Sequence, residues 1–214
     1  MESKSVTIFV FGASGAYGAW DEEGSGWVAR LRKYLDREVS NAEREFYIFN
    51  LGVSGNTTEE LLDRLEFETY QRVREGGEFI FLFEIGLNDS SFIKTRNENR
   101  VLPDDFKENL QYLITLAKKY SENIIFMGLT PINEKEFKPW IEDLYYENKY
   151  VEQYDEIIKS VCSANNLLFV DILNEFKKSG KEVLLYEDGL HPNSAGHQKI
   201  FEIAKSYLMQ NNLI

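Results

Sequence analysis

Short apolar runs recur along the chain, and segments with a helical pattern separate them. Four runs are rich in Ile, Val and Phe and carry few charges; they cover residues 6–11, 45–51, 78–85 and 123–129, and a shorter, similar run covers 167–172. Strands of a parallel sheet are covered on both faces and are therefore apolar along their whole length. The five runs predict five such strands.

The segments between these runs place apolar residues at helical spacing. The expected helices cover residues 26–39, 57–75, 104–120, 146–165 and 194–210. Thr57 and Glu60 form a capping-box pattern at the start of the second helix. Because strand and helix alternate from end to end, the sequence predicts one α/β domain over residues 1–214, a three-layer sandwich with a mostly parallel five-stranded sheet.

Two connections are longer than the others. Residues 86–103 follow the third predicted strand, and residues 130–141 follow the fourth. Both leave the carboxyl ends of strands, where open α/β sheets place their ligand sites. The second connection and the segment after it are aromatic, with Phe137, Trp140, Tyr145, Tyr146 and Tyr150. We expect this segment to supply a substrate wall or lid.

The net charge of the chain limits the kinds of partner that it can bind. With 36 acidic and 24 basic residues the net charge is −12, which argues against a nucleic acid or an anionic membrane as partner. No apolar run approaches the roughly 18 residues of a membrane span, and residues 1–5 lead into the first strand without a signal-like segment. We expect a soluble, cytoplasmic protein, although a secreted chain whose leader has been removed would read the same.

The stretch FGASGAYG, residues 11–18, has a glycine spacing that can mark a dinucleotide-binding turn. Such a turn needs an acid about 20 residues further on, at the end of the second strand, to hold the ribose. Here that strand ends near Asn50 without an acid. Tyr145 and Lys149 have the spacing of a short-chain dehydrogenase pair, which is a weak signal in a chain with 12 tyrosines. An NAD(P)-binding dehydrogenase is therefore a minor alternative, and we expect no cofactor.

The same stretch carries a serine, Ser14, directly after the first strand. Both histidines of the chain lie in DGLHPNSAGH, where His191 follows Asp188 by three residues. A carboxylate at that spacing can accept the Nδ1 hydrogen of the imidazole and leave Nε2 free to take a serine proton. The sequence thus offers Ser14, His191 and Asp188 as nucleophile, base and orienting acid.

Candidate donors for an oxyanion follow the next two strands. Gly52 ends the second strand, and Asn88 comes just after the third. Adjacent parallel strands bring these ends to one edge of the sheet. The N–H groups of Ser14 and Gly52 and the Asn88 side-chain amide would together form an oxyanion hole.

Four segments of the sequence resemble the motifs of one family. FGASGAYG with Ser14, NLGVSGNT with Gly52, GLNDS with Asn88, and DGLHPNSAGH are similar to the motifs of the SGNH hydrolases, also called the GDSL lipase/esterase family. The resemblance spans the domain. It implies a flavodoxin-like fold, hydrolysis of small acyl esters such as acetylated sugars or lysolipids without metal or cofactor, and the site roles given above. The oligomeric state is left open.

The first block departs from the family pattern, in which Gly-Asp-Ser is followed by a β-branched residue or leucine. Here Ala13 and Gly15 flank Ser14. Because these changes alter the nucleophile turn, a binding protein that keeps the fold but not the chemistry is the second hypothesis. Restoring a more usual pair at these positions tests whether activity rises. Glu84, an acid inside an apolar strand, needs partners or a raised pKa.

Overall fold

The computed structural model describes residues 4–41, 43–137, 143–180 and 183–214. Its centre is a five-stranded sheet in the order β2-β1-β3-β6-β8, and every neighbouring pair is parallel. The strands are β1 (Lys4–Gly12), β2 (Arg44–Gly52), β3 (Glu78–Glu84), β6 (Ile124–Met127) and β8 (Leu168–Val170). The parallel sheet predicted from the apolar runs is confirmed.

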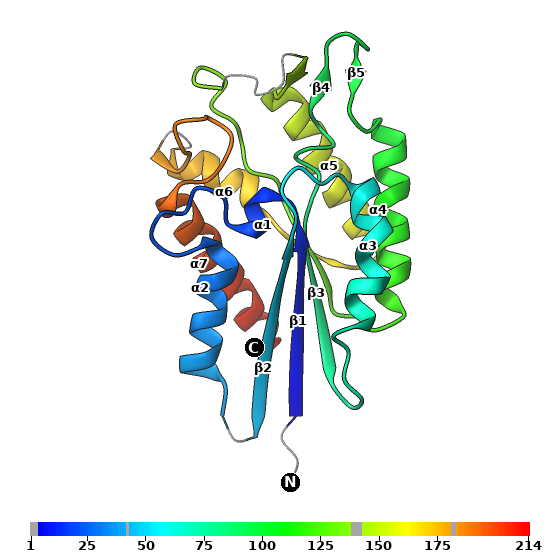
Figure 1. The fold of residues 1–214 in the computed structure, drawn as a ribbon, viewed down its shortest axis with the longest axis vertical. Helices are drawn as coiled ribbons and strands as arrows, with labels where there is room; N and C mark the ends of the chain where they lie inside the picture. Colours follow the sequence, from blue (N-terminus) through cyan, green and yellow to red (C-terminus); the bar gives the residue numbers. More distant parts are fainter. Residues whose placement is uncertain (1–3, 42, 138–142, 181–182) are drawn as a thin grey trace.

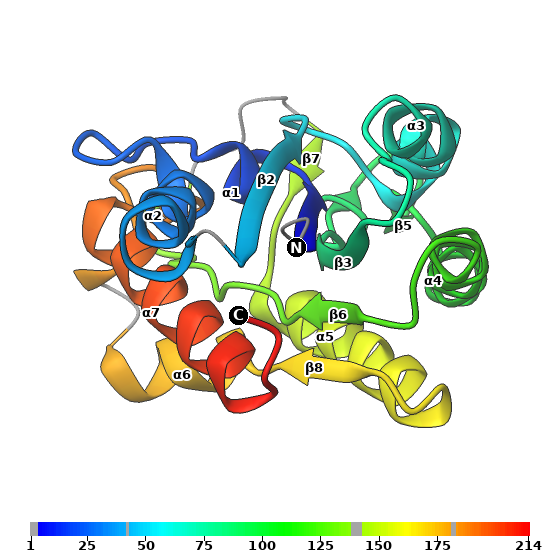
Figure 2. The ribbon, with the colours of Figure 1, turned by 90° about the horizontal axis from the view of Figure 1, so that it is seen from below.

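Helices cover both faces of this sheet (Figures 1 and 2). One face carries α3 (Thr58–Tyr70), α4 (Pro103–Lys118) and α5 (Asn148–Ala164). The other carries α1 (Ser14–Tyr17), α2 (Gly26–Tyr34), the π-helical turn η1 (Leu35–Val39), α6 (Ile172–Ser179) and α7 (Ser194–Gln210). The fold is therefore the expected three-layer α/β/α sandwich. The short α1 and α6 were not predicted.

Strand alternation divides the core into two layers. Phe9, Phe11, Phe81 and Phe83 are fully buried and pack together on the side of α3, α4 and α5. The aliphatic residues between them, such as Val10 of β1 and Leu82 of β3, pack on the side of α2 and α7. Burial of each such side chain stabilises the fold by about 1.5–3 kcal/mol.

A second, antiparallel sheet joins the two long connections. It has the order β5-β4-β7 and consists of β4 (Phe92–Ile93), β5 (Glu98–Asn99) and β7 (Leu144–Tyr145). In Figure 1, β4 and β5 lie beyond the carboxyl ends of the main strands. The sequence did not predict this sheet, because strands of two residues show no periodicity.

The helices of this fold are amphipathic or short. Across the described residues, none combines the length and the apolar character that a span needs.

Candidate active site

Ser14 lies at the carboxyl end of β1, between the ends of its two neighbouring strands. It is the first residue of α1. The turn before it is held from both sides, because Gly12 O accepts the N–H of Val53 at 3.0 Å and Ala13 N–H donates to Glu84 O at 3.3 Å. The main chain of β2 and β3 thus places Ser14 at the edge of the sheet where open α/β folds bind ligands.

The structure brings together the three residues predicted to act on a substrate. Ser14 Oγ lies 2.9 Å from His191 Nε2, and His191 Nδ1 lies 2.7 Å from Asp188 Oδ2. The other carboxylate oxygen, Oδ1, accepts the N–H groups of Leu190 and His191 at 2.9 and 3.0 Å. The three-residue spacing therefore folds back on itself, as predicted, and fixes the imidazole in front of Ser14.

The contacts of His191 define its tautomer. Trp20 Nε1 lies 3.0 Å from the same Nδ1 atom, and the two rings meet edge to face. Burial acts to raise the pKa of Asp188. Hydrogen bonds from the His191 ring and from two backbone N–H groups outweigh burial and hold this pKa below its usual range. Because an ionised carboxylate only accepts, Nδ1 carries the hydrogen and donates to Asp188. Trp20 then packs against the ring without donating to Nδ1, and Nε2 is free to accept from Ser14.

A cavity of about 430 Å³ opens in front of this group. The residues that line it include Ser14, Gly55, Asn88 and His191. Its wall includes Trp20, whose indole also stacks on Tyr186 with ring centroids 5.3 Å apart.

Two of the five aromatic residues proposed as a substrate wall line this cavity. Phe137 and Tyr146 do so and meet edge to face at 5.4 Å. Tyr145 belongs to β7, and Tyr150 stacks on Phe92 of β4 at 5.2 Å. Trp140 lies outside the described residues.

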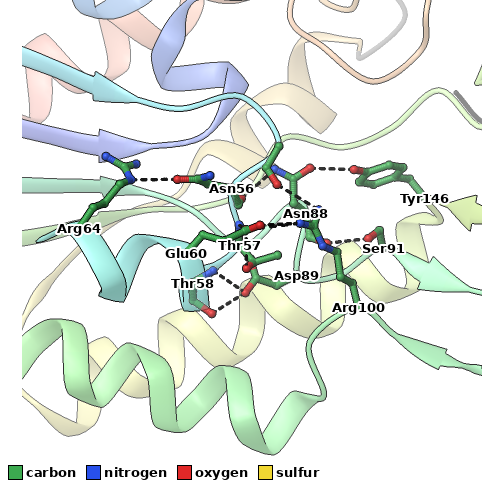
Figure 3. A network of polar contacts seen from close by, with 11 residues as sticks. Asn56, Thr57, Thr58, Glu60, Arg64, Asn88, Asp89, Ser91, Arg100 and Tyr146 are labelled. Atoms are coloured by element: carbon green, nitrogen blue, oxygen red, sulfur yellow. Dashed lines mark hydrogen bonds and ion pairs between the residues drawn. The ribbon is translucent and has the colours of Figure 1, made fainter. Parts of the chain in front are cut away.

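The side chain of Asn88 is held by contacts on both ends of its amide (Figure 3). Its Nδ2 donates to the backbone oxygen of Asn56 at 2.9 Å, and its Oδ1 accepts from the Tyr146 hydroxyl at 2.7 Å. Burial raises the pKa of Tyr146 to about 12, so the phenol keeps its hydrogen and donates. The amide oxygen must face the phenol hydroxyl, which donates, and the amide nitrogen must face the carbonyl, which accepts. The two partners therefore define the orientation of the Asn88 amide.

The loops around Asn88 are tied to α3. Asp89 Oδ1 accepts the backbone N–H of Thr58 at 2.9 Å and also contacts the Thr58 hydroxyl. Arg100 donates to Gly55 O at 3.0 Å and pairs with Glu60 at 3.0 Å. These contacts hold the segment after β2 and the segment after β3 in one block (Figure 3).

Gly52 does not take the predicted place. Its N–H donates to Asn50 Oδ1 at 3.0 Å, and the Asn50 amide also donates to Ala16 O at 2.7 Å. Gly52 is not among the residues that line the cavity, whereas Gly55, three residues later, is. The structure does not support Gly52 N–H as an oxyanion donor, because that N–H donates to the Asn50 side chain, whose amide nitrogen in turn joins β2 to α1.

Neither residue of the dehydrogenase pair reaches the cavity. Lys149 pairs with Glu147 at 2.8 Å and lies over the Tyr150 ring, while Tyr145 takes part in the small sheet. Among the described residues, no group of three or more His, Cys, Asp or Glu side chains is arranged to hold a metal ion.

A family model for the GDSL-like Lipase/Acylhydrolase family matches residues 10–199. The chain belongs to this family. The resemblance seen in the four blocks is confirmed, and the chain is accordingly a carboxylic ester hydrolase.

Two relatives are similar to this chain over most of its length. An acetylxylan esterase of Geobacillus stearothermophilus is 28% identical over 189 residues, which is 86% of this chain and 79% of that protein. An uncharacterised lipoprotein, YqeF of Bacillus subtilis, is 28% identical over 204 residues, 85% of this chain and 81% of that protein.

The same fold occurs in solved structures. Axe2, an acetylxylan esterase from Geobacillus stearothermophilus, has a TM-score of 0.72 and 23% identity, with 97% of this chain and 96% of that chain covered. LAE5, an α/β hydrolase from the metagenome of Lake Arreo, Spain, has a TM-score of 0.74 and 20% identity, with 100% and 98% covered.

Sequence reasoning missed two residues of the site. Trp20, which contacts His191, is a single aromatic residue after the glycine turn and carries no motif. Gly55 stands in the turn that precedes the capping Thr57, and its positive φ of 84° is typical of a glycine in such a turn. A turn signal was present for Gly55; only the fold could place Trp20.

Proposed function

We propose that this chain is a serine esterase that uses Ser14, His191 and Asp188 to hydrolyse small acyl esters. The observation that carries the proposal is the continuous contact from Ser14 Oγ through His191 to Asp188 at the wall of a cavity. A nucleophile joined to a base, with the base joined to an orienting acid, is the arrangement that activates a hydroxyl at neutral pH.

The reaction follows from the tautomer. His191 Nε2 takes the Ser14 proton as Oγ bonds to the ester carbonyl carbon, and Asp188 stabilises the imidazolium that forms. The imidazolium then gives that proton to the alcohol oxygen as its bond to the carbonyl carbon breaks, which leaves an acyl-serine. Water attacks the acyl group with Nε2 as base, and the proton returns to Ser14 Oγ as the carboxylic acid leaves.

The tetrahedral intermediates carry a negative oxygen that needs donors. The Asn88 amide is the best supported, because Tyr146 orients it and one N–H remains beyond the bond to Asn56. We add the N–H of Ser14, and we assign the third position to the N–H of Gly55 in place of Gly52. Removal of one such donor costs about 10²–10³ in kcat in comparable enzymes.

The substrate class is proposed from the cavity and the relatives. The relative and the solved structure from Geobacillus stearothermophilus are both named as acetylxylan esterase, which supports an acetylated carbohydrate as substrate. The cavity wall contains Trp20, Phe137 and Tyr146, and aromatic rings with polar edges bind the apolar faces of sugar rings. A short acyl group on a sugar alcohol is therefore the preferred reading, with a lysolipid as the alternative.

A series of esters tests the acyl group. We expect kcat/KM to be highest for acetate and to fall as the acyl chain lengthens from two to eight carbons, measured with one activated leaving group. An acetylated xylo-oligosaccharide tests the alcohol. A maximum at the long chains would contradict the sugar assignment and favour the lipid-like substrate.

Replacement of Ser14 tests the nucleophile. Ser14→Ala should lower the hydrolysis of an activated acetate ester about 10³-fold or more, because the covalent step is lost. Ser163→Ala, an exposed serine at the end of α5, is the matched control and should behave as wild type. Equal rates for wild type and Ser14→Ala would refute the assignment.

A catalytically inert binding protein is the second candidate, favoured by Ala13 and Gly15 in the nucleophile turn. A serine-reactive phosphonate separates the two. Stoichiometric labelling at Ser14 excludes the inert protein, while an unlabelled, folded protein would favour it.

A further inference from the structure

Glu84 is an acid at a position that strand alternation assigns to the core. Ile80 and Leu82 of β3 point into the layer that holds α2 and α7, and Glu84 is the next residue of that set. Its Oε2 accepts a hydrogen bond at 3.1 Å from Nε1 of Trp27, which is fully buried on α2. A carboxyl group in an apolar layer lowers stability unless contacts offset the loss of water, so its presence calls for a role.

The carboxyl group lies against the turn that carries Ser14. A Cβ atom at Gly15 would lie 2.0 Å from Glu84 Oε1 and 2.9 Å from Cδ, closer than the 3.5–4.0 Å of about optimal non-bonded contact. The Glu84 carboxyl thus occupies the space that a side chain at position 15 would fill. Gly15 does not have a positive φ, so its backbone conformation is open to other residues, and a side chain there would require the Glu84 carboxyl group to shift.

Glu84 also shares a cavity with the reacting pair. A small cavity of about 20 Å³ is lined by Glu84, Gly15, Ser14 and His191, among others. Such a volume is enough for about one water molecule. Glu84 therefore lines the same small space as the two residues that exchange the proton.

We propose that Glu84 is a positioning residue for Ser14. The Glu84 carboxyl group takes the place of the missing side chain of residue 15 and holds the nucleophile turn against β3. This inference rests on the proposed serine esterase function. It explains why the turn can contain Ala13 and Gly15 and still keep Ser14 Oγ at 2.9 Å from His191. A displacement of about 1 Å in such a group can lower the rate 10²-fold.

The experiment is a double-mutant cycle over the two positions. Glu84→Ala empties the space and Gly15→Leu overfills it, so each should lower kcat about 10–100-fold with KM within about 3-fold. The variant with both changes fills the space once again and should regain kcat to within about 5-fold of wild type, since residues in contact depart from additivity. The rate of Ser14 labelling by a phosphonate should follow the same order.

Conservative and control variants complete the design. Glu84→Gln keeps the shape and an acceptor for Trp27, and should keep kcat within about 3-fold. Glu78→Gln, at the exposed start of the same strand, should match wild type. Melting temperatures establish that each variant is folded at the assay temperature.

The proposal is overturned if Glu84→Ala keeps the wild-type kcat, if the two losses simply multiply in the double variant, or if Glu84→Gln loses as much as Glu84→Ala. Each of these results can occur while Ser14→Ala remains inactive. Activity that does not depend on Ser14 would instead refute the proposed function, so the two failures are distinguishable.

Discussion

Among single residues, Asn88 has an orientation that its neighbours define closely. The Tyr146 hydroxyl donates to the amide oxygen, and the Asn56 carbonyl accepts from the amide nitrogen. If the amide were rotated by 180°, its nitrogen would face the hydroxyl donor and its oxygen would face the carbonyl acceptor. Tyr146 comes from the segment after β7, nearly sixty residues away in sequence. The proposed oxyanion donor is therefore oriented by a residue that no local motif contains.

Tyr146→Phe tests this orientation. We expect kcat to fall about 10-fold, less than the 10²–10³ that loss of the whole amide costs, because the Asn56 contact remains. In an Asn88→Ala background the same change should have no further effect. Tyr145→Phe, its neighbour away from the cavity, serves as the matched control. A Tyr146→Phe enzyme with the wild-type kcat would contradict the role.

Gly52 shows where residue-level reasoning from sequence fails. The position of a glycine at the end of a strand can be predicted from the strand, but the direction of its N–H depends on what the neighbouring side chains reach. Here the side chain of Asn50 folds back on Gly52 N–H. Ser14, His191 and Asp188 could be placed because their spacing and strand ends define their contacts, whereas Trp20 and Gly55 depend on loop geometry.

Among the elements, the segment between α1 and α2 lines the cavity without taking part in the sheet. Asp21 accepts the N–H groups of Glu23, Gly24 and Gly26 and pairs with Arg30 at 2.9 Å. Although burial opposes it, the hydrogen bonds from Arg30 and the backbone hold the pKa of Asp21 well below its usual range. The carboxylate thus organises the loop that presents Trp20 to His191.

Asp21→Ala should unfold this loop locally. Loss of a buried carboxylate with several charged hydrogen bonds is expected to lower the free energy of unfolding by about 3 kcal/mol, and to raise KM because Trp20 lines the cavity. Denaturant unfolding and steady-state kinetics measure the two effects. Glu22→Ala, an exposed neighbour, is the control and should change neither quantity. An unchanged unfolding midpoint for Asp21→Ala would contradict this account.

The elements also show which parts of a fold a sequence can specify. The five strands of the main sheet could be predicted because both of their faces are buried, which makes them apolar throughout. The small sheet β5-β4-β7 could not, because two-residue strands are defined by their partners alone. Leu144 of this sheet and Tyr146, the residue after β7, both line the cavity. The element that is harder to predict is therefore the one that contributes to the cavity wall.

For the whole molecule, pH should act on stability in an unusual direction. Burial raises the pKa of Glu84 to about 7 and those of Asp89 and Asp155 to about 6, against hydrogen bonds that oppose the shift. The unfolded chain releases these protons near pH 4, so the folded protein binds more protons between about pH 4 and pH 7. The free energy of unfolding then falls as pH rises through that window. The net charge of −12 adds repulsion at the upper end.

Melting temperatures should therefore rise as pH is lowered from 8 to about 5, and they should rise with salt at pH 8 as the repulsion is screened. Glu84→Gln removes one of the three groups and should reduce the pH dependence by up to about 3 kcal/mol, because burial raises the pKa of Glu84 to about 7. Glu78→Gln should leave the slope unchanged. A melting temperature that falls steadily from pH 8 to pH 5 would contradict the prediction.

The contact between Glu84 and position 15 also bears on how variants of this enzyme can be found. A library that varies position 15 alone offers every larger residue the same obstacle, a carboxyl oxygen 2.0 Å from its Cβ. Screens of single substitutions would therefore sample position 15 only against the Glu84 carboxyl group and would miss every sequence that carries a different support. Improved nucleophile turns are expected only from libraries that randomise residues 15 and 84 together.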